Sequence, residues 1–130
     1  MNFIQISKSQ YKSLKLEASR GSVFLAEIDG ATIRNLSEYL SVIWEVFSIP
    51  DRKHVNYYAY LDWLRDLDWI EKKEFVLIIH NCDKMLHESP EERALILNSF
   101  GMIIIPWWQN EIKQYQVDGE PKPFHVYTVA

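Results

Sequence analysis

The sequence predicts a small α/β domain in which buried parallel strands alternate with helices. Three short apolar stretches, residues 23–28, 75–79 and 124–129, have the length and composition of strands. Between them, apolar residues recur at helical spacing. Strands separated by helices pair in parallel through crossover connections, which indicates a layered α/β fold.

The first half of the chain contains a clear strand and helix. Residues 23–28 form an apolar run closed by Asp29 and Gly30, which predicts a buried strand and a turn. Apolar residues then keep the helical period from residue 36 to 47, with Asn35 or Ser37 as the expected N-cap and a stop at Pro50. The continuously apolar stretch 75–79 is typical of a strand covered on both faces.

The second half predicts two further helices before the last strand. Residues 89–92, Ser-Pro-Glu-Glu, have the pattern of a capping box with proline at the first helical position. A helix is therefore expected from about Pro90 towards Phe100, and Gly101 is expected to loosen or end it. Residues 102–108 suit either a strand or a helix. We place a short helix through Trp107, Trp108 and Ile112.

Residues 1–20 are predicted to be an N-terminal extension of unknown role, ahead of a domain spanning residues 21–130. Periodicity alone allows an extra short strand here, because Phe3, Ile4 and Ile6 form an apolar cluster.

The segment 49–70 predicts an amphipathic helix with an acidic and aromatic exposed side. Pro50 cannot continue the preceding helix, and Asn56 can cap a new one that starts at Tyr57. The helical period places two sets of side chains on opposite sides. The inner set is Tyr57, Tyr60, Leu61, Leu64 and Leu67, and the outer set is Tyr58, Asp62, Asp66 and Trp69.

The outer set favours a binding surface more than a catalytic one. Asp62 and Asp66 stand one turn apart, where like charges cost a helix about 0.2–0.5 kcal/mol. The alternative is an ordinary solvated face whose charge is offset by Arg65 and by the lysines at 72 and 73.

Composition narrows the class of protein. The net charge of −4 and the sequence pI near 5.5 favour a basic protein partner and argue against binding a nucleic-acid backbone. No apolar run is long enough to span a bilayer, and the N-terminus lacks the apolar core of a secretory signal. The single cysteine, Cys82, agrees with a reducing compartment, so a cytoplasmic location is expected.

The strongest cluster of chemically active groups is His80, Cys82, Asp83 and His87. A metal or nucleophilic site there is disfavoured, because a lone thiol lacks the paired spacing of zinc ligands. His54 lies near Asp62 in sequence, but no serine in a nucleophile elbow accompanies them. We expect no enzyme activity, metal or cofactor.

A family resemblance rests on the motif in segment 49–70. The spacing of seven residues there, with the run DWLRDLDW at 62–69, resembles the barstar family of ribonuclease inhibitors. Those residues are Pro50, Asn56, Ala59, Asp62, Leu64, Asp66 and Leu67. Residues 26–50, 74–85 and 123–129 are similar to other elements of the family.

The resemblance implies a three-stranded parallel sheet packed against about four helices. It also implies an immunity protein that occludes the active site of a ribonuclease or related toxin with this helix and the loop before it. By position, Asp62 matches the central inhibitory aspartate of the family, while Asn56 and Pro50 have structural roles. The predicted partner-binding residues are Arg52, His54, Tyr58, Asp62, Asp66 and Trp69.

Three positions depart from the family pattern. Tyr58 stands where the pattern has aspartate, Arg52 where it has an aromatic residue, and His54 where it has glycine. An arginine facing a cationic nuclease site costs affinity, so the departures predict a divergent toxin with its own charge pattern. The alternative is a barstar-like interaction module with no nuclease target. The oligomeric state stays open.

Overall fold

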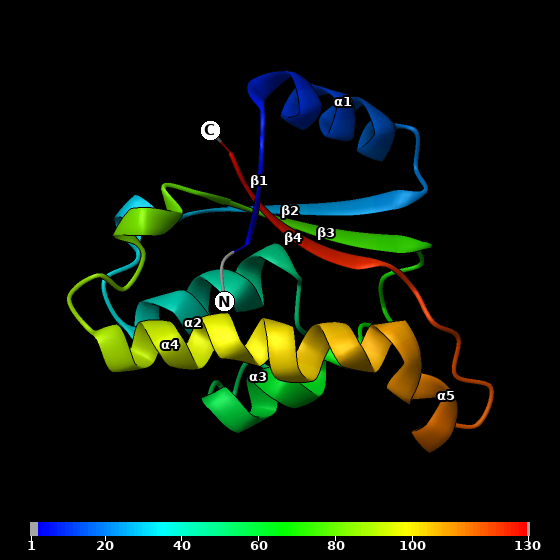
Figure 1. Ribbon diagram of the computed structural model, residues 1–130. Coiled ribbons are helices and arrows are strands. Elements are labelled where there is room, and N and C mark those ends of the chain that lie inside the picture. The colour runs from blue at the N-terminus through cyan, green and yellow to red at the C-terminus, as the bar shows by residue number, and fades with distance from the viewer. Residues whose placement is uncertain (1–2, 130) are drawn as a thin grey trace.

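Four parallel strands form one sheet in the order β1-β4-β3-β2 (Figure 1). The computed structural model describes residues 3–129. The strands are β1 (Ile4–Ile6), β2 (Val23–Asp29), β3 (Glu74–His80) and β4 (Phe124–Val129).

The prediction of three strands is wrong. The additional strand is β1, which pairs with β4 so that Ile4 lies opposite Tyr127. Three residues are too few to show a strand's alternation, and their partner lies at the other end of the chain, so only the folded chain reveals the pairing. Residues expected as an extension of unknown role thus supply an edge strand and the helix that follows it.

Helices cover both faces of the sheet, but unequally (Figure 1). A single helix, α1 (Lys8–Ser19), lies on one face. The other face carries α2 (Leu36–Val46), α3 (Tyr57–Leu64), α4 (Pro90–Ser99) and α5 (Ile112–Tyr115). Short 3-10 turns follow β2 (Gly30–Thr32) and β3 (Cys82–Lys84).

The sheet separates a large core from a small one. All five residues from Phe75 to Ile79 are fully buried, which confirms the predicted strand covered on both faces. Phe75, Leu77 and Ile79 pack into the large core beneath the sheet, whereas Val76 and Ile78 pack under α1. The predicted helix α2 is also confirmed, with the side chain of Asn35 accepting the Glu38 N–H at 2.9 Å.

The chain from α4 to α5 is one continuous helix rather than two. Two π-helical segments, Phe100–Ile104 and Trp107–Glu111, join the α-helical parts. Gly101 lies in the first π-helical segment, so the helix widens there without ending, which is one of the two predicted outcomes. Pro106 has no N–H to donate, and the wider π turns on either side let the helix pass this residue.

Among residues 3–129, no helix is long and apolar enough to cross a membrane.

Candidate partner-binding site

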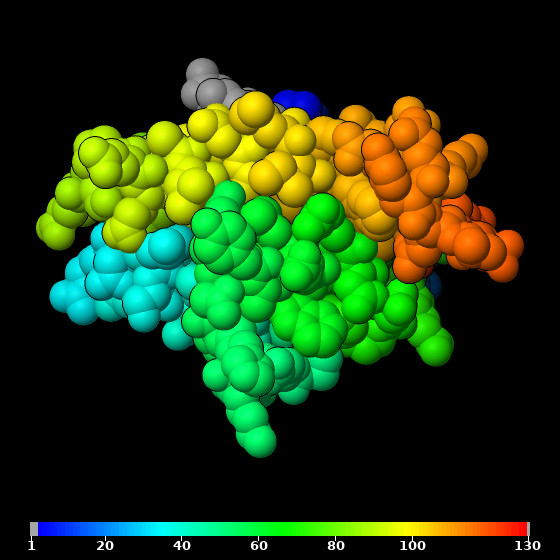
Figure 2. Space-filling view, turned by 90° about the horizontal axis from the view of Figure 1, so that it is seen from below, coloured from blue at the N-terminus to red at the C-terminus, as the bar shows by residue number. Residues whose placement is uncertain are grey.

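The loop between α2 and α3 is anchored at its start. Ile49 is fully buried, and the Trp44 Nε1–H donates to the Asp51 carbonyl at 2.7 Å. These two contacts fix the point at which the chain leaves α2, and Pro50 sits between them. The segment that follows, residues 52–56, is exposed. In Figure 2 the chain around these residues projects at the edge of the face that α3 shares with α2 and the α4–α5 helix.

Arg52 and His54, two of the departures from the family pattern, each contact an acidic side chain of the same chain. Arg52 lies 3.2 Å from Glu45 at the end of α2. The His54 Nδ1 lies 2.9 Å from the Asp51 carboxylate. The hydrogen bonds from His54 and then from the Lys53 N–H lower the pKa of Asp51, so this carboxyl stays charged at neutral pH.

Helix α3 begins as the sequence predicts. The Asn56 side chain accepts the Ala59 N–H at 2.9 Å, which satisfies one of the free donors of the first turn. Tyr60 and Leu64 are fully buried, whereas Tyr58 is 78% exposed. The side chain of Asp62, one turn after Tyr58, is 76% exposed and lies 3.0 Å from Arg65. Tyr58 and Asp62 therefore share an outward face.

The helix ends at Leu64. The prediction of an inner and an outer set of side chains requires a helix that continues to Trp69. In a longer helix, the Leu64 carbonyl would accept the Asp68 N–H. Here Trp108 Nε1–H donates to that carbonyl at 2.9 Å, and the Asp68 N–H donates to the Asp66 side chain instead. Leu67 then adopts a positive φ of 55°. The predicted placement of Asp66 and Trp69 on the exposed face of this helix is therefore wrong.

Asp66 lies in the turn after α3. Burial first, and then the neighbouring Asp68 carboxyl, raise the pKa of Asp66, so its charged form is disfavoured relative to an isolated aspartate. It is half-buried, and it contributes less freely available charge to the surface than Asp62 does.

Trp69 is half-buried and has a clear packing role. Its Nε1–H donates to the Phe47 carbonyl at 2.8 Å, a group left free at the end of α2. Its ring lies edge-on against Trp63 with centroids 5.5 Å apart. Trp69 thus ties the turn after α3 to the end of α2, and a contact of Trp69 with a partner stays a prediction.

Arg65 is a neighbour of the site that the sequence reasoning treated only as a charge offset. Its guanidinium pairs with Asp62 and also lies 5.9 Å from the centroid of the Trp107 ring. Trp107 in turn stacks on Tyr115 of α5, which is 73% exposed. The spacing of Asp62 and Arg65 signals their pairing, but nothing local signals that Trp107 lies beneath the arginine.

The cluster predicted around the end of β3 does not assemble into a metal site. Within residues 3–129, no group of three or more His, Cys, Asp or Glu side chains is arranged to hold a metal ion. His80 bonds to Glu27 at 2.8 Å, and His87 bonds to the Lys84 carbonyl. Burial raises the pKa of Cys82, which disfavours the reactive thiolate.

The comparison with protein families decides the identity of the fold. The family model described as barstar (barnase inhibitor) matches residues 23–127. The chain belongs to the barstar family. This family consists of inhibitors rather than enzymes. Among curated proteins, none matches the sequence.

The match includes the loop before α3, the whole of α3 and the α4–α5 helix of this barstar-family protein. Strand β1 and helix α1 lie outside it. The recognised part of the chain therefore contains every predicted partner-binding residue, and the additional strand and helix are features beyond the matched region.

Proposed function

We propose that this barstar-family protein inhibits a ribonuclease by covering its active site with α3 and the preceding loop. The observation that carries the proposal is the exposed carboxylate of Asp62 on the outward face of α3. Family membership supports a ribonuclease as the partner, because the family model is described by inhibition of barnase. A ribonuclease binds RNA phosphates with cationic groups, so a carboxylate can occupy their place.

The electrostatics of the site favour this role. Among the described residues, Asp62 forms an ion pair only with Arg65, and an exposed ion pair of this kind contributes about 0–1 kcal/mol. Exchanging Arg65 for a cation of the partner therefore costs little. The net charge of −4 also favours rapid encounter with a basic enzyme.

Tyr58 supplies a second anchor. It replaces an acidic residue of the family pattern, and at 78% exposure it presents a large aromatic surface one turn from Asp62. Tyrosine is enriched among residues that dominate binding energy. Met102, on the π segment that packs against α3, is also exposed, at 73%.

The intramolecular pairs of the loop reduce the charge conflict expected from Arg52 and His54. Glu45 compensates the Arg52 guanidinium, and the His54 ring is hydrogen-bonded to the Asp51 carboxylate, so the loop presents a smaller positive charge than Arg52 alone suggests. We infer a partner with a mixed surface at this loop and a cationic pocket opposite Asp62.

The test measures inhibition of barnase and of a panel of bacterial ribonuclease toxins by the wild-type chain and by Asp62→Ala. For a nuclease that is inhibited, we expect Asp62→Ala to weaken binding by at least about 2 kcal/mol, roughly thirtyfold in Kd. The association rate of the wild-type protein should also fall steeply with added salt.

The matched control is Asp83→Ala, an exposed carboxylate after β3 and away from α3, which should leave inhibition within about twofold. Equal inhibition by wild type and Asp62→Ala would contradict the proposed interface. Binding of another protein by the α3 face, with none of the nucleases inhibited, would favour the interaction module.

A further inference from the structure

The two strands beside β4 are followed by helices on opposite faces of the sheet. Strand β1 leads up into α1, which crosses the sheet to β2 at the opposite edge. The later connections step between neighbouring strands through helices on the other face, and β3 leads down towards α4 (Figure 1). The two neighbours of β4 therefore send the chain to opposite faces. In open α/β sheets, such a switch point at the carboxyl ends of the strands is where ligands bind.

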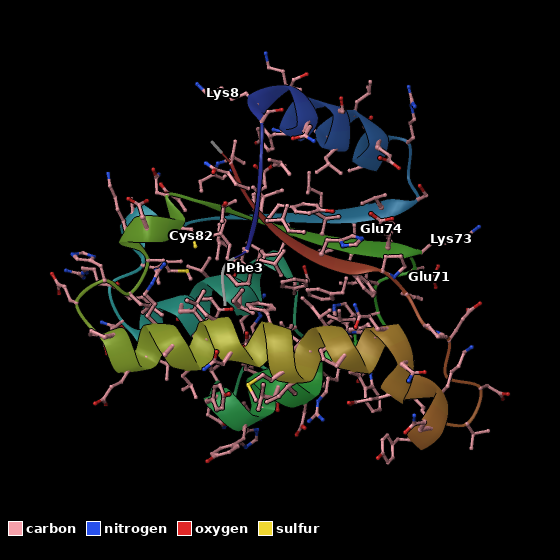
Figure 3. All side chains as sticks on the ribbon, viewed as in Figure 1. Phe3, Lys8, Glu71, Lys73, Glu74 and Cys82 are labelled. Carbon is pink, nitrogen blue, oxygen red and sulfur yellow. The ribbon has the colours of Figure 1, made fainter. Side chains whose placement is uncertain are left out.

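A crevice of about 390 Å³ lies at this switch point. Its lining residues are Lys8, Tyr11 and Lys12 of α1, His80 and Asn81 at the end of β3, and Val129 at the end of β4. In Figure 3, Lys8 and Cys82 lie towards the end of the sheet where β3 finishes, whereas Lys73 and Glu74 mark the opposite end. The volume falls within the range of small-molecule sites, about 300–1,000 Å³.

The crevice is basic in an acidic protein. Residues 1–22 carry four Lys and Arg side chains against one Glu, whereas the rest of the chain carries ten against seventeen. Lys8 and Lys12 stand one turn apart on α1, and within residues 3–129 neither side chain forms an ion pair or a hydrogen bond. Their charges are available to a ligand.

Two carboxylates lie beside the crevice, Asp29 on Asn81 and Glu27 on His80, and neither forms an ion pair with Lys8 or Lys12 within residues 3–129. Glu27, on the face of β2 beneath α1, accepts a hydrogen bond from the Tyr11 hydroxyl and lies 2.8 Å from His80 Nε2. It also lies 3.7 Å from Lys15. The carboxylate is thus already compensated by groups other than Lys8 and Lys12.

The donor set indicates the class of ligand. Lys8 and Lys12 supply two ammonium point charges for an anion, and lysine is a common ligand of phosphate. The Tyr11 ring and Val129 supply apolar surface for an organic group. The net charge of −4 disfavours a long polyanion. We propose that this crevice binds a small phosphate ester.

The first experiment titrates the full-length protein at pH 7 with four probes, and NMR shifts of the His80 ring and of the α1 amides report binding. Adenosine 5′-monophosphate should give saturable shifts at these positions. Inorganic phosphate should shift the same signals with weaker affinity, and adenosine should bind at least about tenfold more weakly than its phosphate. Equal binding of adenosine, tighter binding of benzoate, or no saturable shift up to about 10 mM would overturn the proposal.

The second experiment uses the double variant Lys8→Ala/Lys12→Ala. Both side chains are exposed and unpaired among the described residues, so the variant should fold, as circular dichroism can verify. We expect at least about tenfold weaker binding of adenosine 5′-monophosphate, because two charged contacts are lost. The matched control Lys73→Ala/Lys113→Ala removes the same charge elsewhere and should bind as wild type. Equal loss in both double variants would indicate a general charge effect and contradict the site.

Discussion

Asp62 and Trp69 belong to one acidic and aromatic run, but Asp62 is exposed and Trp69 is half-buried. The Asp62 side chain is 76% exposed, and within residues 3–129 its only ion-pair partner is Arg65, so a binding partner can reach it. The Trp69 ring is half-buried, and its indole N–H is already bonded to Phe47. The sequence pattern predicts that both side chains are exposed, but it does not show which of them a partner can reach. Exposure depends on where the helix between the two residues ends.

At the residue scale, Trp69→Phe should destabilise the fold and leave Asp62 on the surface. The substitution removes the bond to the Phe47 carbonyl and leaves that acceptor less satisfied, at a cost of about 1–3 kcal/mol. Urea unfolding measures this cost. Trp63→Phe is the matched control, because it changes the edge-on partner of the same aromatic pair without touching the bond to Phe47. Equal destabilisation by the two variants would contradict the role given to the indole N–H.

At the element scale, the two ends of α3 have different origins. Its start is local, because the Asn56 side chain caps the first turn within a few residues. Its end is set by Trp108, which lies far along the chain and takes the Leu64 carbonyl. The same contrast holds for the α4–α5 helix, where the capping pattern at Ser89 predicts the start but the π segments carry the helix past Gly101 and Pro106.

Asn56→Ala should destabilise the protein by about 1 kcal/mol, since α3 loses the cap of its first turn. Asn56→Ser should restore most of this loss, because serine also accepts a bond from the third residue of a helix. Thermal unfolding of the three proteins measures both effects. A serine variant as unstable as the alanine variant would show that Asn56 acts through something other than capping.

At the scale of the whole molecule, Glu27 links α1 to the sheet through polar contacts. Tyr11 and Lys15 reach this carboxylate from α1, and His80 reaches it from β3. Burial opposes the charge of Glu27, but the bonds from Tyr11 and His80 outweigh it and lower its pKa. Beneath α1 lies the small core, against which Tyr11, Leu14 and Ala18 of the helix also pack. This polar anchor therefore contributes to holding α1 in place.

The lowered pKa of Glu27 determines how its contribution to stability changes with pH. A carboxyl whose folded pKa lies below its unfolded value stabilises the fold at neutral pH, and this contribution is lost as the pH falls through the folded pKa. We expect hydrogen exchange of the α1 amides to accelerate as the pH drops below about 4, after correction for intrinsic rates. In Glu27→Gln the protection should be lower at neutral pH and nearly independent of pH. Identical protection profiles for wild type and Glu27→Gln would contradict the anchor.

The sequence by itself determined the parts of this protein that depend on local pattern. Hydrophobic period and capping act over a few residues, so the sequence predicts the elements that depend on them. These are the buried strand around Phe75–Ile79, the helix capped by Asn35, the start of α3 at Asn56 and the family motif around Asp62. Only the tertiary structure decided what depends on distant partners. It pairs β1 with β4, ends α3 through Trp108, and brings α1 over the end of β3, because strand pairing and helix termination are settled by groups that meet only when the chain is folded.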